Sequence, residues 1–142
     1  MTTGAERSKL METSDTLEAI EECYRRGWSD GLPVVPPVDY KVREMLEYAG
    51  MTGEEELLSL EMRNRALTSN NAAANAVMAG CLPEYFPVLV TALKTLEEEK
   101  NFVHMASAST SSPAILMLVN GPIRDQIGMN YNDGLSGPGY RG

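Results

Sequence analysis

The chain has few of the residues from which metal centres and disulfide frameworks are built. Its 142 residues include two cysteines and one histidine, and Cys23 and Cys81 lack the sequence spacing of metal ligands. A chain of this length buries roughly two-thirds of its unfolded surface without covalent staples. No apolar signal segment opens the sequence. We therefore expect free thiols and a cytoplasmic setting. The cysteine spacing assigns no metal ligands, and the sequence identifies no cofactor.

Basic residues and long apolar runs are also scarce. Lys and Arg number 12 against 20 Asp and Glu, which gives a net charge of −8. Nucleic acids and anionic membranes bind basic surfaces, so this charge predicts that neither is a partner. The longest apolar run, residues 113–119, is far shorter than the roughly 20 residues that span a bilayer. A soluble, acidic protein is expected.

Helical patterns dominate the first two-thirds of the chain. Apolar residues at helical spacing predict helices over residues 15–26 and 39–49, which Gly27 and Gly50 end. Two more, over residues 71–79 and 83–96, are expected to meet at a short turn that contains Cys81. Residues 51–68 fit either a short helix or a short strand.

The segment between the first two helices is expected to be an extended loop. Residues 27–37 contain three prolines and two glycines, which exclude a regular helix or a central strand. Trp28 is the only tryptophan in the chain, and we expect it to anchor this loop to the core. Asp30 is expected to cap the turn at Gly31, or alternatively to face a site.

Two strands are predicted in the last third. Residues 101–108 alternate with period two. Residues 114–119 are uninterruptedly apolar, as in a strand covered on both faces. After them, Pro122 opens a short helix that runs to Ile127. The expected fold is α/β or α+β, with a small sheet that contains the buried strand 114–119 and is packed by several helices.

The domain organisation follows from composition. Residues 1–14 are polar and without periodicity, and we expect a mobile tail there. Residues 15–129 are expected to form a single globular domain. Residues 130–142 are rich in glycine and would be costly to order alone, so we expect a partner chain to order this loop. The alternatives are a longer precursor that is cut here and a disordered loop.

Several segments together resemble a known family. They are Gly-Trp-Ser-Asp-Gly-Leu-Pro-Val-Val-Pro-Pro at 27–37, Asn-Ala-Val-Met-Ala-Gly-Cys-Leu-Pro-Glu-Tyr at 75–85, and shorter matches at 119–123 and 137–141. This pattern resembles the N-terminal portion of a poorly characterised bacterial family associated with UGSC-motif (seleno)proteins. The resemblance covers residues 15–142. It implies thiol or redox chemistry, in proteins that continue beyond the Gly-rich loop into a further helical segment.

Cys81 is the first candidate for chemistry. It precedes a predicted helix N-terminus, where the macrodipole favours a thiolate that can act as a nucleophile. His104 is the candidate base for it, and Glu84 a candidate general acid or base. Each has a structural alternative. Cys81 can fill a gap beside Gly80, His104 can be a core residue, and the Glu84 carboxylate can interact with the positive end of the helix dipole.

A substrate site is predicted at the end of the second strand. The turn at Asn120 and Gly121 offers backbone N–H groups, and Arg124 lies one turn further on, so a carboxylate or phosphate would be stabilised there. Ser109 and Thr110 belong to a run of hydroxyl residues that can line the same crevice. The alternatives are a plain strand-to-helix connection and a solvated loop.

Three functions are consistent with these residues. The first is a subunit of a soluble hetero-oligomeric enzyme that acts on a small anionic molecule through the thiolate of Cys81, as an oxidoreductase, lyase or hydrolase. The second is a non-catalytic scaffold subunit that docks a catalytic partner, with an unreactive Cys81 and a large apolar interface. The third is a metal-binding subunit that uses Cys81, His104 and either Glu84 or Asp30.

Overall fold

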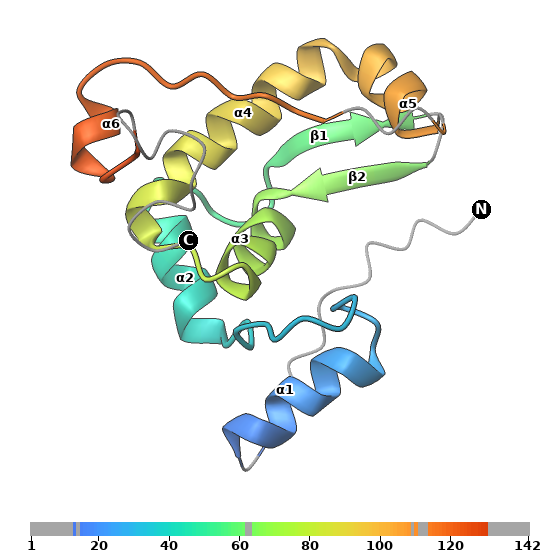
Figure 1. Ribbon diagram of the computed structural model, residues 1–142, viewed down its shortest axis with the longest axis vertical. Coiled ribbons are helices and arrows are strands. Elements are labelled where there is room, and N and C mark those ends of the chain that lie inside the picture. Colours follow the sequence, from blue (N-terminus) through green and yellow to red (C-terminus); the bar gives the residue numbers. More distant parts are fainter. Residues whose placement is uncertain (1–12, 14, 62–63, 109, 111–113, 131–142) are drawn as a thin grey trace.

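The computed structural model describes residues 13, 15–61, 64–108, 110 and 114–130 (Figure 1). Helices and one small antiparallel sheet make up this part of the chain, which confirms the expected α+β mixture. The elements in chain order are α1 (Thr16–Arg25), α2 (Asp39–Tyr48), β1 (Glu56–Leu60), β2 (Arg65–Thr68), α3 (Ser69–Met78), the 3-10 helix η2 (Pro83–Tyr85), α4 (Phe86–Glu98), α5 (Lys100–Ala108) and α6 (Ile123–Gln126).

The core lies where α2, α3, α4 and β1 meet (Figure 1). Helix α3 faces it with alanines, whose small side chains let α2 and α4 approach closely. Phe86 begins α4 and is completely buried. The core residues are Val42, Met45 and Leu46 of α2, Leu57 of β1, Ala72, Ala73, Ala76 and Val77 of α3, and Phe86 and Val90 of α4.

The sheet is a hairpin that packs against α4. Strands β1 and β2 pair antiparallel, with Leu60 opposite Arg65 and Glu56 opposite Thr68. A bulge between Glu56 and Leu58 leaves Leu57 turned into the core. The Glu97 carboxylate of α4 accepts a 2.6 Å hydrogen bond from the Ser59 amide, which ties this helix to the sheet. Of the two expectations for residues 51–68, the strand is therefore the one observed.

A carboxylate clamp joins the hairpin to α3. Glu55 accepts hydrogen bonds from the Thr52 amide at 2.7 Å, the Gly53 amide at 2.9 Å and the buried Ser69 hydroxyl at 2.6 Å. These donors, the Ser69 hydroxyl first, lower the pKa of Glu55 to about 2. The Gly53 carbonyl accepts from the Asn70 amide at 3.1 Å. The clamp thus fixes where α3 begins.

We expect the stability of the chain to depend on this carboxylate in acid. The pKa of Glu55 is about 2 in the folded chain, against 4.5 for a free glutamate. The contribution of Glu55 is therefore fully present above pH ~4.5 and is lost as pH falls towards ~2. In thermal melts across this range, Glu55→Gln should melt lower than wild type at neutral pH, and the two curves should converge at low pH. Glu54→Gln, at the exposed neighbouring residue, is the control. An equal fall in its melting temperature would contradict the role of the clamp.

Most predicted helices are confirmed. Helices α1, α2, α3, η2 with α4, and α6 lie where the sequence predicts them. Residues 27–37 contain neither helix nor strand, also as expected. The predicted tail and Gly-rich loop, residues 1–14 and 130–142, lie outside the described residues except for Thr13 and Asn130. Among the described helices, none combines the length and the apolar character needed to cross a membrane.

Both predicted strands of the last third are wrong. Residues 101–108 belong to α5, because a short run of Val, Met and Ala satisfies a helical pattern as well as an alternating one. Residues 114–119, named the apolar segment from here on, form no strand within the described part of the chain. They are also not buried: Ile115 is 70% exposed, Leu116 83%, Met117 51% and Leu118 83%. A strand covered on both faces needs neighbours, and the described residues supply none.

Candidate functional site

Cys81 lies directly after the C-terminal end of α3. Gly80 has φ +79°, its amide donates to the Val77 carbonyl at 2.9 Å, and the Cys81 amide donates to the Ala76 carbonyl at 3.0 Å. This is the hydrogen-bond pattern of a Schellman helix end. The Cys81 side chain is half-buried and packs against the core. The structural alternative for Cys81, a residue that fills space beside Gly80, accounts for this position.

The pKa of Cys81 is shifted in the direction opposite to our expectation. Burial raises the pKa of the thiol, whereas the sequence suggested that a following helix would lower it. Cys81 is next to the C-terminus of α3, where the macrodipole disfavours an anion, and the helix after it begins with the short η2 at Pro83. Burial thus favours the thiol form of Cys81 over the thiolate.

The two longer segments of the family resemblance meet beside Cys81. The amide of Val35, from the segment 27–37, donates to the carbonyl of Met78, from the segment 75–85, at 3.2 Å. We call Val35, Met78 and residues 80–85 the Cys81 junction. Glu84 lies in η2 within this junction and is half-buried. Sequence reasoning marked both segments but not their contact, because a backbone hydrogen bond leaves no signal in residue type.

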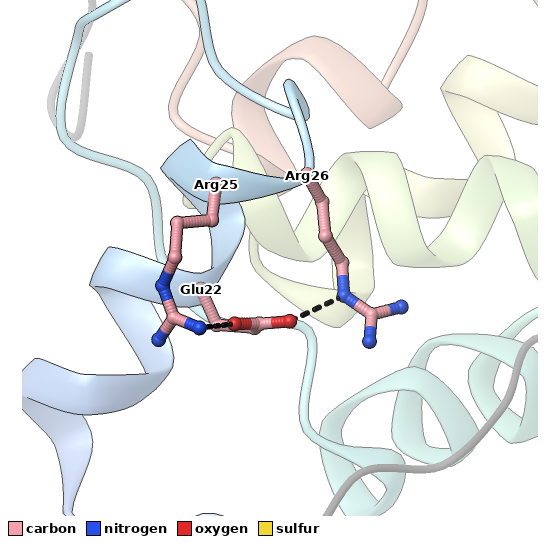
Figure 2. Close-up of polar contacts among 3 residues, drawn as sticks. All are labelled: Glu22, Arg25 and Arg26. Atoms are coloured by element: carbon pink, nitrogen blue, oxygen red, sulfur yellow. Dashed lines mark hydrogen bonds and ion pairs between the residues drawn. The ribbon is translucent and has the colours of Figure 1, made fainter.

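Trp28 does not anchor the loop to the core. Its side chain is 47% exposed, and the guanidinium of Arg26 lies 5.3 Å from the ring centroid. Figure 2 shows the Glu22 carboxylate between Arg25 and Arg26, with ion pairs of 2.5 Å and 2.7 Å. The hydrogen bond from Arg26 lowers the pKa of Glu22. The tryptophan is thus a surface residue held by the end of α1. Asp30 is exposed in the same loop, where the Ser29 hydroxyl accepts from the Gly31 amide at 3.1 Å.

His104 and Cys81 are separated by the length of α4. Cys81 precedes this helix, and His104 lies on α5, which follows it at the end remote from α2 (Figure 1). A helix of 13 residues is about 20 Å long at 1.5 Å per residue. The structure therefore does not bring the predicted base to the thiol. His104 is half-buried and its Nδ1 atom is shielded from solvent, which fits a packed position on α5.

The predicted anion-binding turn offers few groups to a ligand. Asn120 and Gly121 are exposed, and the Arg124 amide already donates to the Gly121 carbonyl at 3.2 Å. The Arg124 guanidinium lies 3.3 Å from the Asp125 carboxylate. Helix α6 after the turn has only four residues, so its macrodipole is small. Thr110 is exposed, and Ser109 lies outside the described residues.

The predicted metal-binding set is not assembled. Where the chain is described, no three His, Cys, Asp or Glu side chains gather closely enough to hold a metal ion. Cys81, His104, Glu84 and Asp30 all belong to that part. The described residues therefore do not bring this set together, chiefly because α4 separates His104 from Cys81.

Comparison of the chain with protein-family models, with curated proteins and with solved structures found no match. The resemblance to UGSC-motif proteins therefore stays a prediction. Functional inference rests on the geometry of the described residues. Its most unusual element is the exposed apolar segment, which sequence reasoning recognised as apolar but placed inside the molecule as a buried strand.

Proposed function

We propose that this chain is a docking subunit of a hetero-oligomeric enzyme in the cytoplasm, and that its partner chain covers the apolar segment. The observation that supports this is the exposure of Ile115, Leu116, Met117 and Leu118 in one continuous run. Single exposed apolar residues are normal on protein surfaces, whereas contiguous ones mark sites of association. Burial of one leucine side chain is worth roughly 1.5–3 kcal/mol, so this run alone favours association substantially.

The state of Cys81 agrees with a docking role. A scaffold subunit is expected to carry an unreactive cysteine, and burial raises the pKa of this thiol. The candidate base lies beyond α4 and the candidate anion site is partly satisfied by Asp125. Catalytic groups of such an enzyme would then belong mainly to the partner chain.

Native mass spectrometry of the assembly, purified from its own cells without denaturation, tests the proposal. We expect this chain to appear together with a second, different polypeptide at a fixed ratio. A monomer, or an assembly that contains copies of this chain alone, would contradict a docking subunit.

The second candidate function is catalysis by Cys81 on a small anionic molecule. The observation in its favour is the hydrogen bond from Val35 to Met78, which joins both longer segments of the resemblance beside a thiol that is only half-buried. Glu84, in η2, is the candidate acid or base within this junction, and Asn120, Gly121 and Arg124 would contact the substrate. A cation from the partner chain would have to lower the pKa of the thiol.

Thiol labelling across pH separates the two candidates. In the chain alone we expect iodoacetamide to modify Cys81 more slowly than free cysteine at pH 8, because burial raises the pKa of Cys81. Cys23 should not react, since it is 2% exposed and its pKa is raised as well. Cys81→Ala identifies the labelled site. Fast labelling of Cys81 in the assembly, with an apparent pKa below that of free cysteine, would favour catalysis.

A further inference from the structure

We infer that Asn120 is a site of spontaneous modification, where the side-chain amide is lost as ammonia and an aspartate or isoaspartate is left. This inference does not depend on the proposed function. The reaction requires the backbone nitrogen of the next residue to reach the asparagine side chain, and glycine hinders this approach least because it lacks a Cβ. Asn120 is the only asparagine in the sequence that a glycine follows. Whether the pair reacts then depends on how the fold holds it.

The fold leaves both reacting groups accessible. Asn120 and Gly121 are exposed and lie outside the helices and strands, shortly before α6 (Figure 1). Gly121 has φ +98°, and an atom at the position of a Cβ would meet no other atom within 4 Å. The Gly121 amide and the Asn120 side chain donate no hydrogen bond to another described residue. Neither group therefore has to leave such a partner before it reacts.

Two comparable sites are held more firmly. Asp30 also precedes a glycine and can form the same ring, but the Gly31 amide donates to the Ser29 hydroxyl at 3.1 Å. Asn75 lies within α3, and its side-chain amide donates to the Asn71 carbonyl at 2.8 Å. The residue after Asn75 belongs to the same helix, so reaction there must wait for local opening of α3. The fold thus singles out Asn120.

The chemistry needs only water and hydroxide. Hydroxide removes the proton of the Gly121 amide, and this nitrogen then forms a bond to Cγ of Asn120. The Cγ–Nδ2 bond breaks, the departing nitrogen takes a proton from water, and ammonia leaves a five-membered succinimide ring. Water opens the ring at one of its two carbonyl carbons. Attack at Cγ gives aspartate, and attack at the backbone carbonyl carbon gives isoaspartate, in which the main chain runs through the former side chain.

Conversion changes this turn in two ways. The unperturbed pKa of the new carboxyl group is about 3.9, so the group is ionised at neutral pH and adds one negative charge. Isoaspartate also lengthens the main chain by one methylene between the apolar segment and α6. The new carboxylate would repel the carboxylate or phosphate that the turn at Asn120 and Gly121 was predicted to bind. The converted fraction rises with the age of the chain, so old and new chains differ at this turn.

Peptide mass spectrometry of the folded chain, incubated at several pH values from neutral to mildly alkaline, tests this inference. We expect Asn120 to convert roughly 100-fold faster than Asn75, because Asn75 reacts only after local opening of α3. The rate at Asn120 should rise in proportion to the hydroxide concentration. The succinimide, lighter than the starting peptide by one ammonia, should precede the two products. Asn120→Gln is the matched control: it keeps the amide but would have to form a six-membered ring, so we expect it to stay intact.

A parallel incubation in urea separates the effect of the fold from that of the sequence. Asn120 should convert at a similar rate in the folded and the unfolded chain, whereas Asn75 should convert much faster once α3 is unfolded. Strong slowing of Asn120 by folding would mean that the fold protects this site, and would overturn the inference. Conversion of Asn120 no faster than that of Asn75 in the folded chain, or loss of ammonia from Asn120→Gln at the wild-type rate, would overturn it as well.

Discussion

Replacing Phe86 with alanine is expected to destabilise the chain by about 3–5 kcal/mol. Phe86 is completely buried where η2 passes into α4, among side chains of α2 and α3. Alanine side chains, such as those of α3, have no rotamers and cannot move to fill the cavity that the ring would leave. Domains of this size are stable by only about 5–15 kcal/mol, so the variant should lose a large share of its stability. Urea unfolding followed by circular dichroism measures the change.

An exposed leucine provides the matched control. Leu116 is 83% exposed, so Leu116→Ala should change the unfolding free energy of the isolated chain by no more than about 0.5 kcal/mol. The pair also separates the core from the docking surface, since both changes remove a large apolar side chain. Equal unfolding midpoints for the two variants would mean that the core is not centred on the start of α4.

The double variant Leu116→Asp with Leu118→Asp is expected to abolish docking without unfolding the chain. The two leucines are the most exposed large apolar side chains of the apolar segment, so a partner that covers the segment would bury both. Loss of two leucine contacts is worth about 3–6 kcal/mol, or a factor of roughly 10² to 10⁴ in the dissociation constant, before the burden of burying two carboxylates. Native mass spectrometry over a dilution series measures this loss.

Leu17→Asp is the control for that experiment. Leu17 is 69% exposed on α1, a comparable exposure at a distant place in the sequence. It should leave the assembly intact, and all three variants should keep the circular dichroism of the wild type. If the double variant assembled as tightly as Leu17→Asp, the apolar segment would not be the docking surface.

The helices were predictable from the sequence because their ends carry strong local signals. Gly27, Gly50 and Gly80 each adopt positive φ directly after a helix, at the positions where glycine predicted the ends. The hairpin was less predictable. The bulge at Leu57 interrupts the alternation of β1, and the non-glycine Asn64 adopts the left-handed turn conformation with φ 49°. Neither feature produces a regular pattern of apolar residues.

The site was less predictable than the fold because it depends on contacts between distant segments. The sequence placed Cys81 at a junction of helices, but the raised pKa of its thiol reflects burial against the core. The separation of His104 from Cys81 depended on α5 being a helix after α4 rather than a returning strand. For residues 114–119 the apolar character was evident from local sequence, whereas a paired and buried strand requires neighbours that local sequence does not specify.

Oxidation of two methionines would test the docking surface most directly. Met117 lies in the apolar segment and is 51% exposed, and Met105 on α5 is 63% exposed. In the isolated chain, dilute hydrogen peroxide should convert both to sulfoxides at similar rates, as peptide mass spectrometry can measure. In the natively purified assembly, we expect Met105 to oxidise as before and Met117 to be protected. Equal oxidation of Met117 with and without the partner chain would contradict the account.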